Sequence, residues 1–105
     1  MATPRIDVPM DKVAAFCRKW KITELSLFGS VLRDDFGPDS DVDVLVTFAP
    51  DASWSLFDLV HAQDELKDIL GREVDLVERE AVVRSENYIR RRHILESVEP
   101  VYVAR

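Results

Sequence analysis

The run Asp41-Val42-Asp43-Val44-Leu45-Val46, in which side-chain character alternates, constrains the fold of this chain more than any other segment. Alternate side chains of a β-strand point to opposite faces of a sheet. The three valines are therefore expected to enter a core, while Asp41 and Asp43 project together from the other face. Two aligned carboxylates suit a hard cation such as Mg²⁺, which takes oxygen ligands from one or two carboxylates and from substrate phosphates.

A tight turn is predicted twelve residues before this run. Residues 22–28 have the composition of a strand, and Gly29-Ser30 follow as a turn whose next amides would face an anion such as phosphate. Each feature alone has an ordinary explanation, because Gly and Ser are common in turns and acidic residues solvate many strands. Their combination at this spacing is much rarer. An EF-hand loop is excluded, because Val44 stands where that loop requires glycine.

A third carboxylate is expected beside the first two. Residues 73–77 alternate as a second short strand, which follows a helical stretch ending at Gly71. A strand, a helix and another strand predict parallel neighbouring strands, so Asp75 would join the aspartate pair. Three carboxylates could hold two cations about 3.5 to 4 Å apart for an in-line displacement at phosphorus. Glu73 has the same parity and stays an alternative, although the mid-strand position favours Asp75.

The remaining segments predict an α/β protein, a small mixed sheet flanked by helices, with one domain over residues 1–105. After Pro9, a first helix would bury Val13, Phe16, Cys17 and Trp20. Ser55 and Asp58 form a capping box that begins the crossover helix. Its apolar positions are Leu56, Leu59, Val60, Leu66, Ile69 and Leu70. Residues 85–98 are expected to form a last helix, and residues 101–103 a short extended tail.

Composition narrows the possible functions. The charge of −6 and the pI near 4.8 argue against a broad nucleic-acid footprint, which requires a basic face. No segment has the apolar length of a membrane span or a signal peptide, so we expect a cytoplasmic protein. With 105 residues the chain is too small for a separate substrate domain, so we expect the acceptor to be another protein. Three glycines cannot supply a Walker loop or a dinucleotide fingerprint. Cys17 is the only cysteine, and His61 and His93 lack a metal-ligand spacing.

The motif set as a whole resembles that of the minimal nucleotidyltransferases of the DNA polymerase beta-like superfamily. The residues that carry the resemblance are Gly29-Ser30, Arg33, Ser40-Asp41, Asp43 and Asp75. The resemblance implies the polymerase beta-like nucleotidyltransferase fold and two Mg²⁺ ions held by Asp41, Asp43 and Asp75. It also implies an ATP triphosphate held at Gly29, Ser30, Arg33 and Ser40. Many such proteins are antitoxins that transfer AMP from ATP to a tyrosine hydroxyl of a HEPN ribonuclease toxin, which implies a toxin partner encoded nearby.

Two other functions remain open at this point. One is a non-catalytic antitoxin that neutralises its toxin by binding; the other is the catalytic subunit of a small-molecule, antibiotic-type nucleotidyltransferase. The basic run Arg90-Arg91-Arg92-His93 is either a solvated helix face or a contact with phosphates or an acidic partner. Trp54 is either packed or a partner anchor. The sequence leaves the oligomeric state open, and the loop at Asp34-Asp35 is acidic where the family often has small or basic residues.

Overall fold

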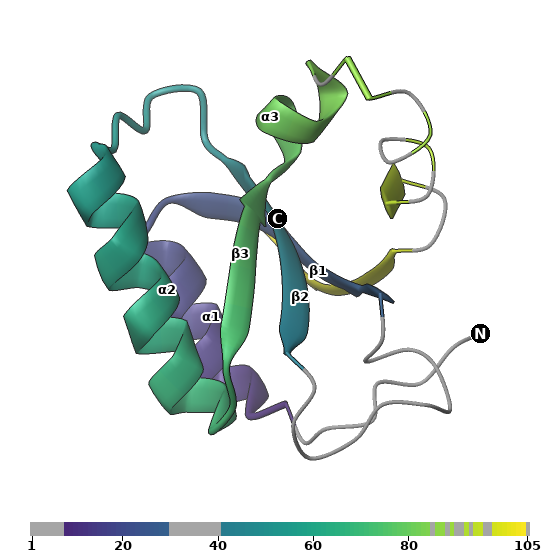
Figure 1. Ribbon diagram of the computed structural model, residues 1–105. Helices are drawn as coiled ribbons and strands as arrows, with labels where there is room; N and C mark the ends of the chain where they lie inside the picture. The colour runs from purple at the N-terminus through teal and green to yellow at the C-terminus, as the bar shows by residue number, and fades with distance from the viewer. Residues whose placement is uncertain are drawn as a thin grey trace.

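The computed structural model describes residues 8–29, 41–84, 86–87, 89, 92, 94–95 and 98–104. In these residues four strands form a mixed sheet of order β3-β2-β1-β4 (Figure 1). The elements are α1 (Met10–Lys19), β1 (Ile22–Phe28), β2 (Val42–Phe48), α2 (Leu56–Leu70), β3 (Val74–Glu78), α3 (Arg79–Val83) and β4 (Glu99–Val103). β1 pairs antiparallel with β2 and β4, and β2 pairs parallel with β3. The predicted mixed sheet with flanking helices is confirmed.

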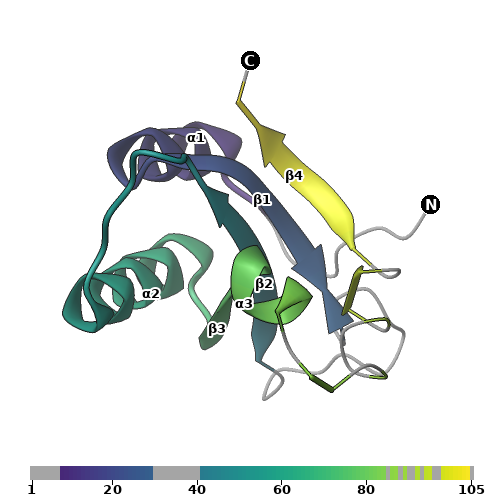
Figure 2. The ribbon, with the colours of Figure 1, turned by 90° about the horizontal axis from the view of Figure 1, so that it is seen from above.

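The sheet has a different cover on each face. Seen from above, α1 and α2 lie on one side of the strands (Figure 2). There Val42, Val44 and Val46 of β2 pack with buried residues of both helices, as the alternation predicted. On the other face, Leu45 joins a smaller buried cluster with Phe28, Val82 and Ile94. The second cluster involves α3 and residues after it, so in the described part of the chain this face has a smaller cover than the helix face.

α1 buries the predicted face. Val13, Phe16, Cys17 and Trp20 are all buried. Burial raises the pKa of the Cys17 thiol to about 12. Since the thiolate is the reactive form, this cysteine serves as a core residue and not as a nucleophile. Trp54 also packs, because its Nε1 donates a hydrogen bond to the Trp20 carbonyl at 3.0 Å and the two rings meet edge-on.

Local signals define both ends of α2 as predicted. Ser55 Oγ accepts a hydrogen bond from the Asp58 amide at 3.2 Å, and Asp58 Oδ2 accepts one from the Ser55 amide at 2.9 Å. The hydrogen bonds from Ser55 lower the pKa of the Asp58 carboxyl. The helix ends at Gly71, whose φ of +69° is the left-handed conformation that glycine adopts at little cost.

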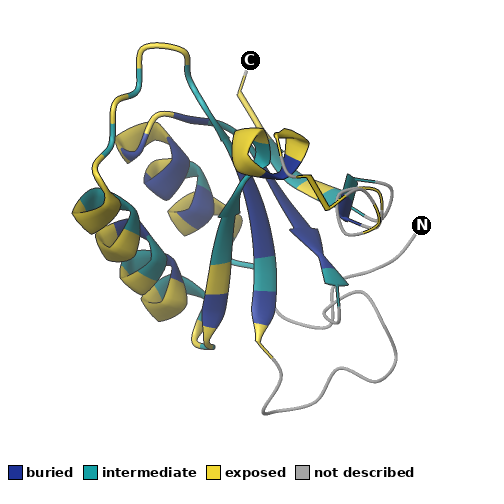
Figure 3. Cartoon of the chain, turned by 45° about the horizontal axis from the view of Figure 1, so that its top comes forward, coloured by how far each residue is buried: buried dark blue, intermediate teal, exposed yellow. Residues whose placement is uncertain are grey.

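The predicted apolar face of α2 is wrong in its first turns. Ala62 and Leu66 are buried against the sheet, but Leu56 and Val60 are exposed. Residues four apart lie on one helix face, so these two lie together, and their face is turned away from Ala62 and Leu66 at 3.6 residues per turn. In Figure 3 the outer side of α2 is exposed, whereas the central strands are buried.

The end of the chain differs from the prediction. A short helix, α3, follows β3 directly and was not predicted, because five residues are too few to show a helical period. Residues 101–103 are extended as predicted, but they belong to the longer strand β4, whose pairing with β1 was not predicted. Much of the helix predicted at residues 85–98 lies outside the described residues, and those described there, including Ile89, Ile94 and Leu95, are partly helical. In the described part of the chain, no helix is long and apolar enough to span a membrane.

A partly buried hydrogen bond between Trp20 and Glu65 makes the stability of the fold depend on pH. Trp20 Nε1 donates to Glu65 Oε2 at 2.6 Å, and Lys19 Nζ lies 3.1 Å from the same carboxylate. The Trp20 hydrogen bond in particular lowers the pKa of Glu65. A carboxyl whose pKa is lowered by folding stabilises the protein above its ordinary pKa, and the stabilisation is lost as the pH falls through the folded-state pKa.

Glu65→Gln is therefore expected to lower the free energy of unfolding at pH 7 by about 1 kcal/mol. The variant keeps an acceptor for Trp20 but loses the charge, so its loss of stability relative to the wild type should shrink below pH 4. Urea unfolding between pH 3 and pH 7 measures this. Asp64→Asn, one position away and exposed on α2, serves as the control. A difference that stays constant over this range would contradict the assignment.

Candidate active site

Two of the predicted carboxylates meet across neighbouring strands. In the parallel pairing of β2 with β3, Asp43 lies directly opposite Asp75. Neighbouring strands are about 4.8 Å apart, and paired residues point to the same face of the sheet. The residues before them, Val42 and Val74, are buried on the helix side, so the aspartates lie on the face away from α1 and α2. Asp43 is half-buried and Asp75 is exposed.

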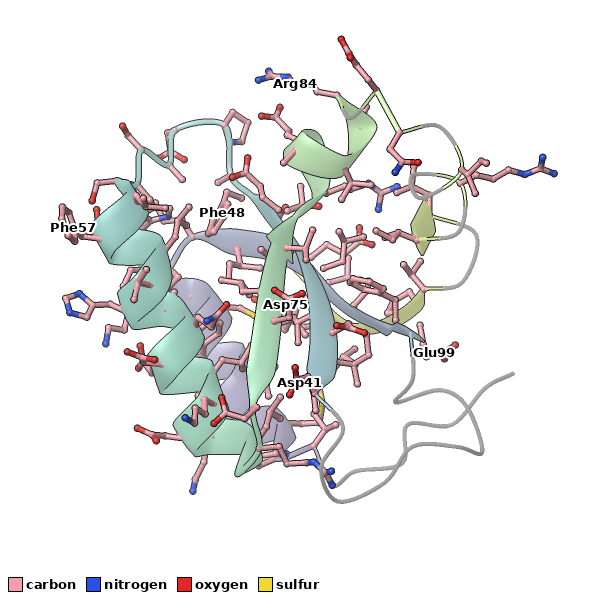
Figure 4. All side chains as sticks on the ribbon, viewed as in Figure 1. Asp41, Phe48, Phe57, Asp75, Arg84 and Glu99 are labelled. Carbon is pink, nitrogen blue, oxygen red and sulfur yellow. The ribbon has the colours of Figure 1, made fainter. Side chains whose placement is uncertain are left out.

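Asp41 lies one residue before β2 and is exposed. Figure 4 shows Asp41 and Asp75 in front of the sheet, with Asp41 at the end where β2 begins. Among the described residues, no three His, Cys, Asp or Glu side chains are close enough together to form a metal-binding group. The structure thus brings Asp43 and Asp75 together as a pair and leaves Asp41 near it. Whether the three bind metal stays a prediction.

Gly29, directly after β1, contacts Asp43 of this pair. Phe28, the last residue of β1, pairs with Asp43, and Gly29 follows with a φ of +76°. A Cβ atom built on Gly29 would collide with the Asp43 carboxylate oxygen Oδ2. Glycine is thus required here for two reasons, the left-handed backbone and the close approach to a carboxylate. The sequence predicted the turn but did not predict this contact.

The donor set at this place fits the implied metal. The side chains that meet are carboxylates, which are the ligands preferred by Mg²⁺, and Mg²⁺ commonly completes its coordination with water and substrate phosphates. The glycine turn lets the backbone pass close to Asp43 without a side chain in between. As far as the described residues go, a triphosphate could therefore approach Asp43 and Asp75 from the face of the sheet opposite α1 and α2. The residues present are consistent with a metal-bound nucleotide.

Glu73, the alternative to Asp75, has a different partner. Its Oε1 lies 2.7 Å from Lys67 Nζ on the last turn of α2. The hydrogen bond to Glu73 raises the pKa of Lys67. Because α2 covers the other face of the sheet, this ion pair directs the Glu73 carboxylate away from Asp43. The geometry favours Asp75 as the third acidic residue.

An ion pair that the sequence did not predict spans the far end of the same sheet face. Arg79, the first residue of α3, lies 3.6 Å from Glu24 of β1. Glu24 also accepts a hydrogen bond at 3.5 Å from Ser26, which is buried. The pair lies toward the end of β2 opposite Asp41, so α3 covers that end, and none of the described helices covers the aspartate end.

Several predicted site residues lie outside the described part of the chain. These are Ser30, Arg33 and Ser40, together with Arg90, Arg91 and His93. Within the described part, Arg92 is exposed and His61 is exposed on α2. The predicted contacts of the Gly29-Ser30 turn with phosphate, and the alternatives for the basic run, stay predictions.

Comparison with known proteins identifies the family to which this chain belongs. The nucleotidyltransferase domain family matches residues 10–98. A Methanocaldococcus jannaschii protein, MJ0435, inferred to be a protein adenylyltransferase, is 38% identical over 66 residues, 63% of this chain and 69% of the relative. The match thus spans about two thirds of that relative's length.

Two solved structures share the fold. One is a chain of a toxin–antitoxin crystallised with AMP-PNP; it has a TM-score of 0.69 and 20% identity, over 92% of this chain and 75% of that chain. The other comes from a complex of a tri-AMPylated Shewanella oneidensis HEPN toxin with its MNT antitoxin. Its TM-score is 0.61 at 21% identity, over 90% of this chain and 70% of that chain. At sequence identities of 20% and 21%, the structural similarity establishes the fold alone.

Proposed function

Because this chain belongs to the nucleotidyltransferase domain family, we propose that it transfers AMP from ATP to a tyrosine hydroxyl of a HEPN ribonuclease toxin and so acts as its antitoxin. The observation that carries the proposal is the in-register pair Asp43 and Asp75 with Gly29 against it. Support comes from the MJ0435 relative, inferred to be a protein adenylyltransferase, and from the fold shared with an antitoxin bound to an AMPylated HEPN toxin. We place the reaction in the cytoplasm.

In this proposal the aspartates position the nucleotide. Asp41, Asp43 and Asp75 would hold two Mg²⁺ ions, which would supply positive charge against the phosphates. The turn at Gly29-Ser30, with Arg33 and Ser40, binds the triphosphate. Asp43 and Asp75 are on a rigid sheet, so the α-phosphorus is held in one place relative to the acceptor hydroxyl.

The bond changes are those of an in-line displacement. The tyrosine oxygen forms a bond to the α-phosphorus, and the bond from that phosphorus to the bridging oxygen of pyrophosphate breaks. Asp75, which is exposed, accepts the hydroxyl proton. The products are AMP-tyrosine and pyrophosphate. A protein side chain would approach the aspartates from the face opposite α1 and α2, where Asp75 is exposed among the described residues.

Intact-mass spectrometry of the toxin tests the proposal. The purified HEPN protein encoded beside this gene is incubated with this protein, ATP and Mg²⁺. We expect mass additions of one or more AMP units, which EDTA prevents, and peptide mapping should locate them on tyrosine. A stable complex without any added mass would contradict the transferase function and favour an antitoxin that acts by binding.

A further inference from the structure

A group of large apolar side chains on α2 is exposed to solvent. Leu56, Phe57 and Val60 have exposed fractions of 77%, 81% and 50%. In Figure 4, Phe57 projects outward from α2, away from the sheet. Single exposed apolar residues are common, but contiguous ones beside a groove are typical of interaction sites. We call Leu56, Phe57 and Val60 the α2 patch.

Leu56 and Val60 of the α2 patch line the first of two adjoining hollows, and Phe57 lies outside both. The first, of about 180 Å³, is lined mainly by apolar residues that include Leu56, Val60, Phe48 and Leu76. The second, of about 300 Å³, shares Phe48 with the first and extends along residues 49–54. Together they form a groove between α2 and the ends of β2 and β3, in which the first hollow is mainly apolar and the second mainly polar. A groove of this kind accepts protruding apolar side chains.

The ionisable side chains that line the groove are all acidic. The ionisable residues that line the two hollows are Glu78 and Glu80. Arg84 lies 3.7 Å from Glu80 and points along α3, and it lines neither hollow. The edge of the groove is therefore acidic, in a protein of charge −6. An occupant with Lys or Arg beside its apolar residues would be complementary in charge.

Two other occupants are disfavoured. A second copy of this chain, paired through the same patch, would bring Glu78 and Glu80 against their own equivalents, and like charges oppose such pairing. An added β-strand would need the outer edge of β3. There the Leu76 amide already donates to Gln63 Oε1 at 3.1 Å, so one of the edge groups needed for pairing is occupied.

We propose that the α2 patch and its groove are the docking surface for the acceptor protein, which inserts apolar side chains flanked by basic ones. This inference takes the identity of the partner, a HEPN toxin, from the proposed function and rests on it to that extent. The groove lies at the end of β2 opposite Asp41, about 20 Å away over seven residues of strand. Because the groove is on the α2 side of the sheet and the aspartates are on the other side, an acceptor docked in the groove would reach them past the outer edge of β3, so binding and transfer are separable.

The double variant Leu56→Ser/Phe57→Ser tests the docking surface. Both side chains are exposed, so the fold should be kept, as circular dichroism and thermal unfolding can verify. Titration calorimetry with the purified HEPN protein should give at least a tenfold weaker Kd, whereas the affinity for ATP with Mg²⁺ stays unchanged. Glu80→Lys should also weaken the complex, and more strongly at low salt. Val103→Ser, which removes another exposed apolar side chain on β4, should bind like the wild type.

The outcomes separate this inference from the proposed function. If the wild type modifies the toxin and the double variant binds it with unchanged Kd, the docking surface is wrong and the transferase stands. If the wild type binds without transferring AMP and the double variant loses binding, the docking surface stands and the transferase fails. Loss of wild-type self-association in the double variant, seen by sedimentation, would assign the patch to a second copy and overturn the inference. No binding by the wild type would overturn it as well.

Discussion

Asp43→Asn is expected to reduce AMP transfer by about 10³-fold while the protein stays folded. Asparagine keeps the size and one oxygen of the side chain but removes the charge that the proposed metal-bound nucleotide requires. Losses of about 10²- to 10³-fold are typical when one group that stabilises transition-state charge is removed. Since Asp43 is half-buried on the face opposite α1 and α2 and outside the buried core, stability should change little. Single-turnover transfer at saturating ATP, followed by intact mass, measures the loss.

Asp75→Asn and Glu73→Gln form the matched pair for this experiment. The two residues lie two positions apart, but Asp75 pairs with Asp43 and Glu73 pairs with Lys67. We expect Asp75→Asn to lose transfer on a scale similar to that of Asp43→Asn, and Glu73→Gln to keep it. The assignment fails if Glu73→Gln is the inactive variant, or if Asp43→Asn still modifies the toxin at the wild-type rate.

Features determined by neighbouring residues were predictable from the sequence. The capping box at Ser55 and Asp58 and the stop at Gly71 depend on a few adjacent residues, and both occur as expected. The pairing of Asp43 with Asp75 was also predictable, because a strand–helix–strand connection constrains the two strands to be parallel. The sequence resemblance to the nucleotidyltransferase family is confirmed by the family match and the shared fold.

Features that depend on distant pairing were not predictable. β4 has only five residues and contains Pro100, so its sequence alone indicates an extended tail. It is a strand because it pairs with the edge of β1. The sequence placed Leu56 and Val60 on the buried face of α2, but both are exposed. Their apolar spacing fits a helix, and only packing against the sheet determines which side of the helix is buried. The contact of Gly29 with Asp43 depends on the register of β1 with β2, which no local motif encodes.

Gly29→Ala is expected to damage both the fold and the reaction. The added Cβ would collide with the Asp43 carboxylate, and alanine at a φ of +76° costs about 1 to 2 kcal/mol. We expect the melting temperature to fall by about 5 °C or more and transfer to fall by about 10²-fold, because the Asp43 side chain must move. Differential scanning fluorimetry and the intact-mass assay measure the two effects.

Gly71→Ala is the control that separates these causes. Gly71 has nearly the same backbone angle, with a φ of +69°, but a Cβ there would meet no atom within 4 Å. It should therefore lower stability by a similar backbone cost while transfer stays at the wild-type rate. The loss of transfer in Gly29→Ala beyond that in Gly71→Ala then measures the effect of the collision with Asp43. Equal transfer rates in the two variants would mean that the Asp43 position is not critical, and the proposed role of this carboxylate would have to be abandoned.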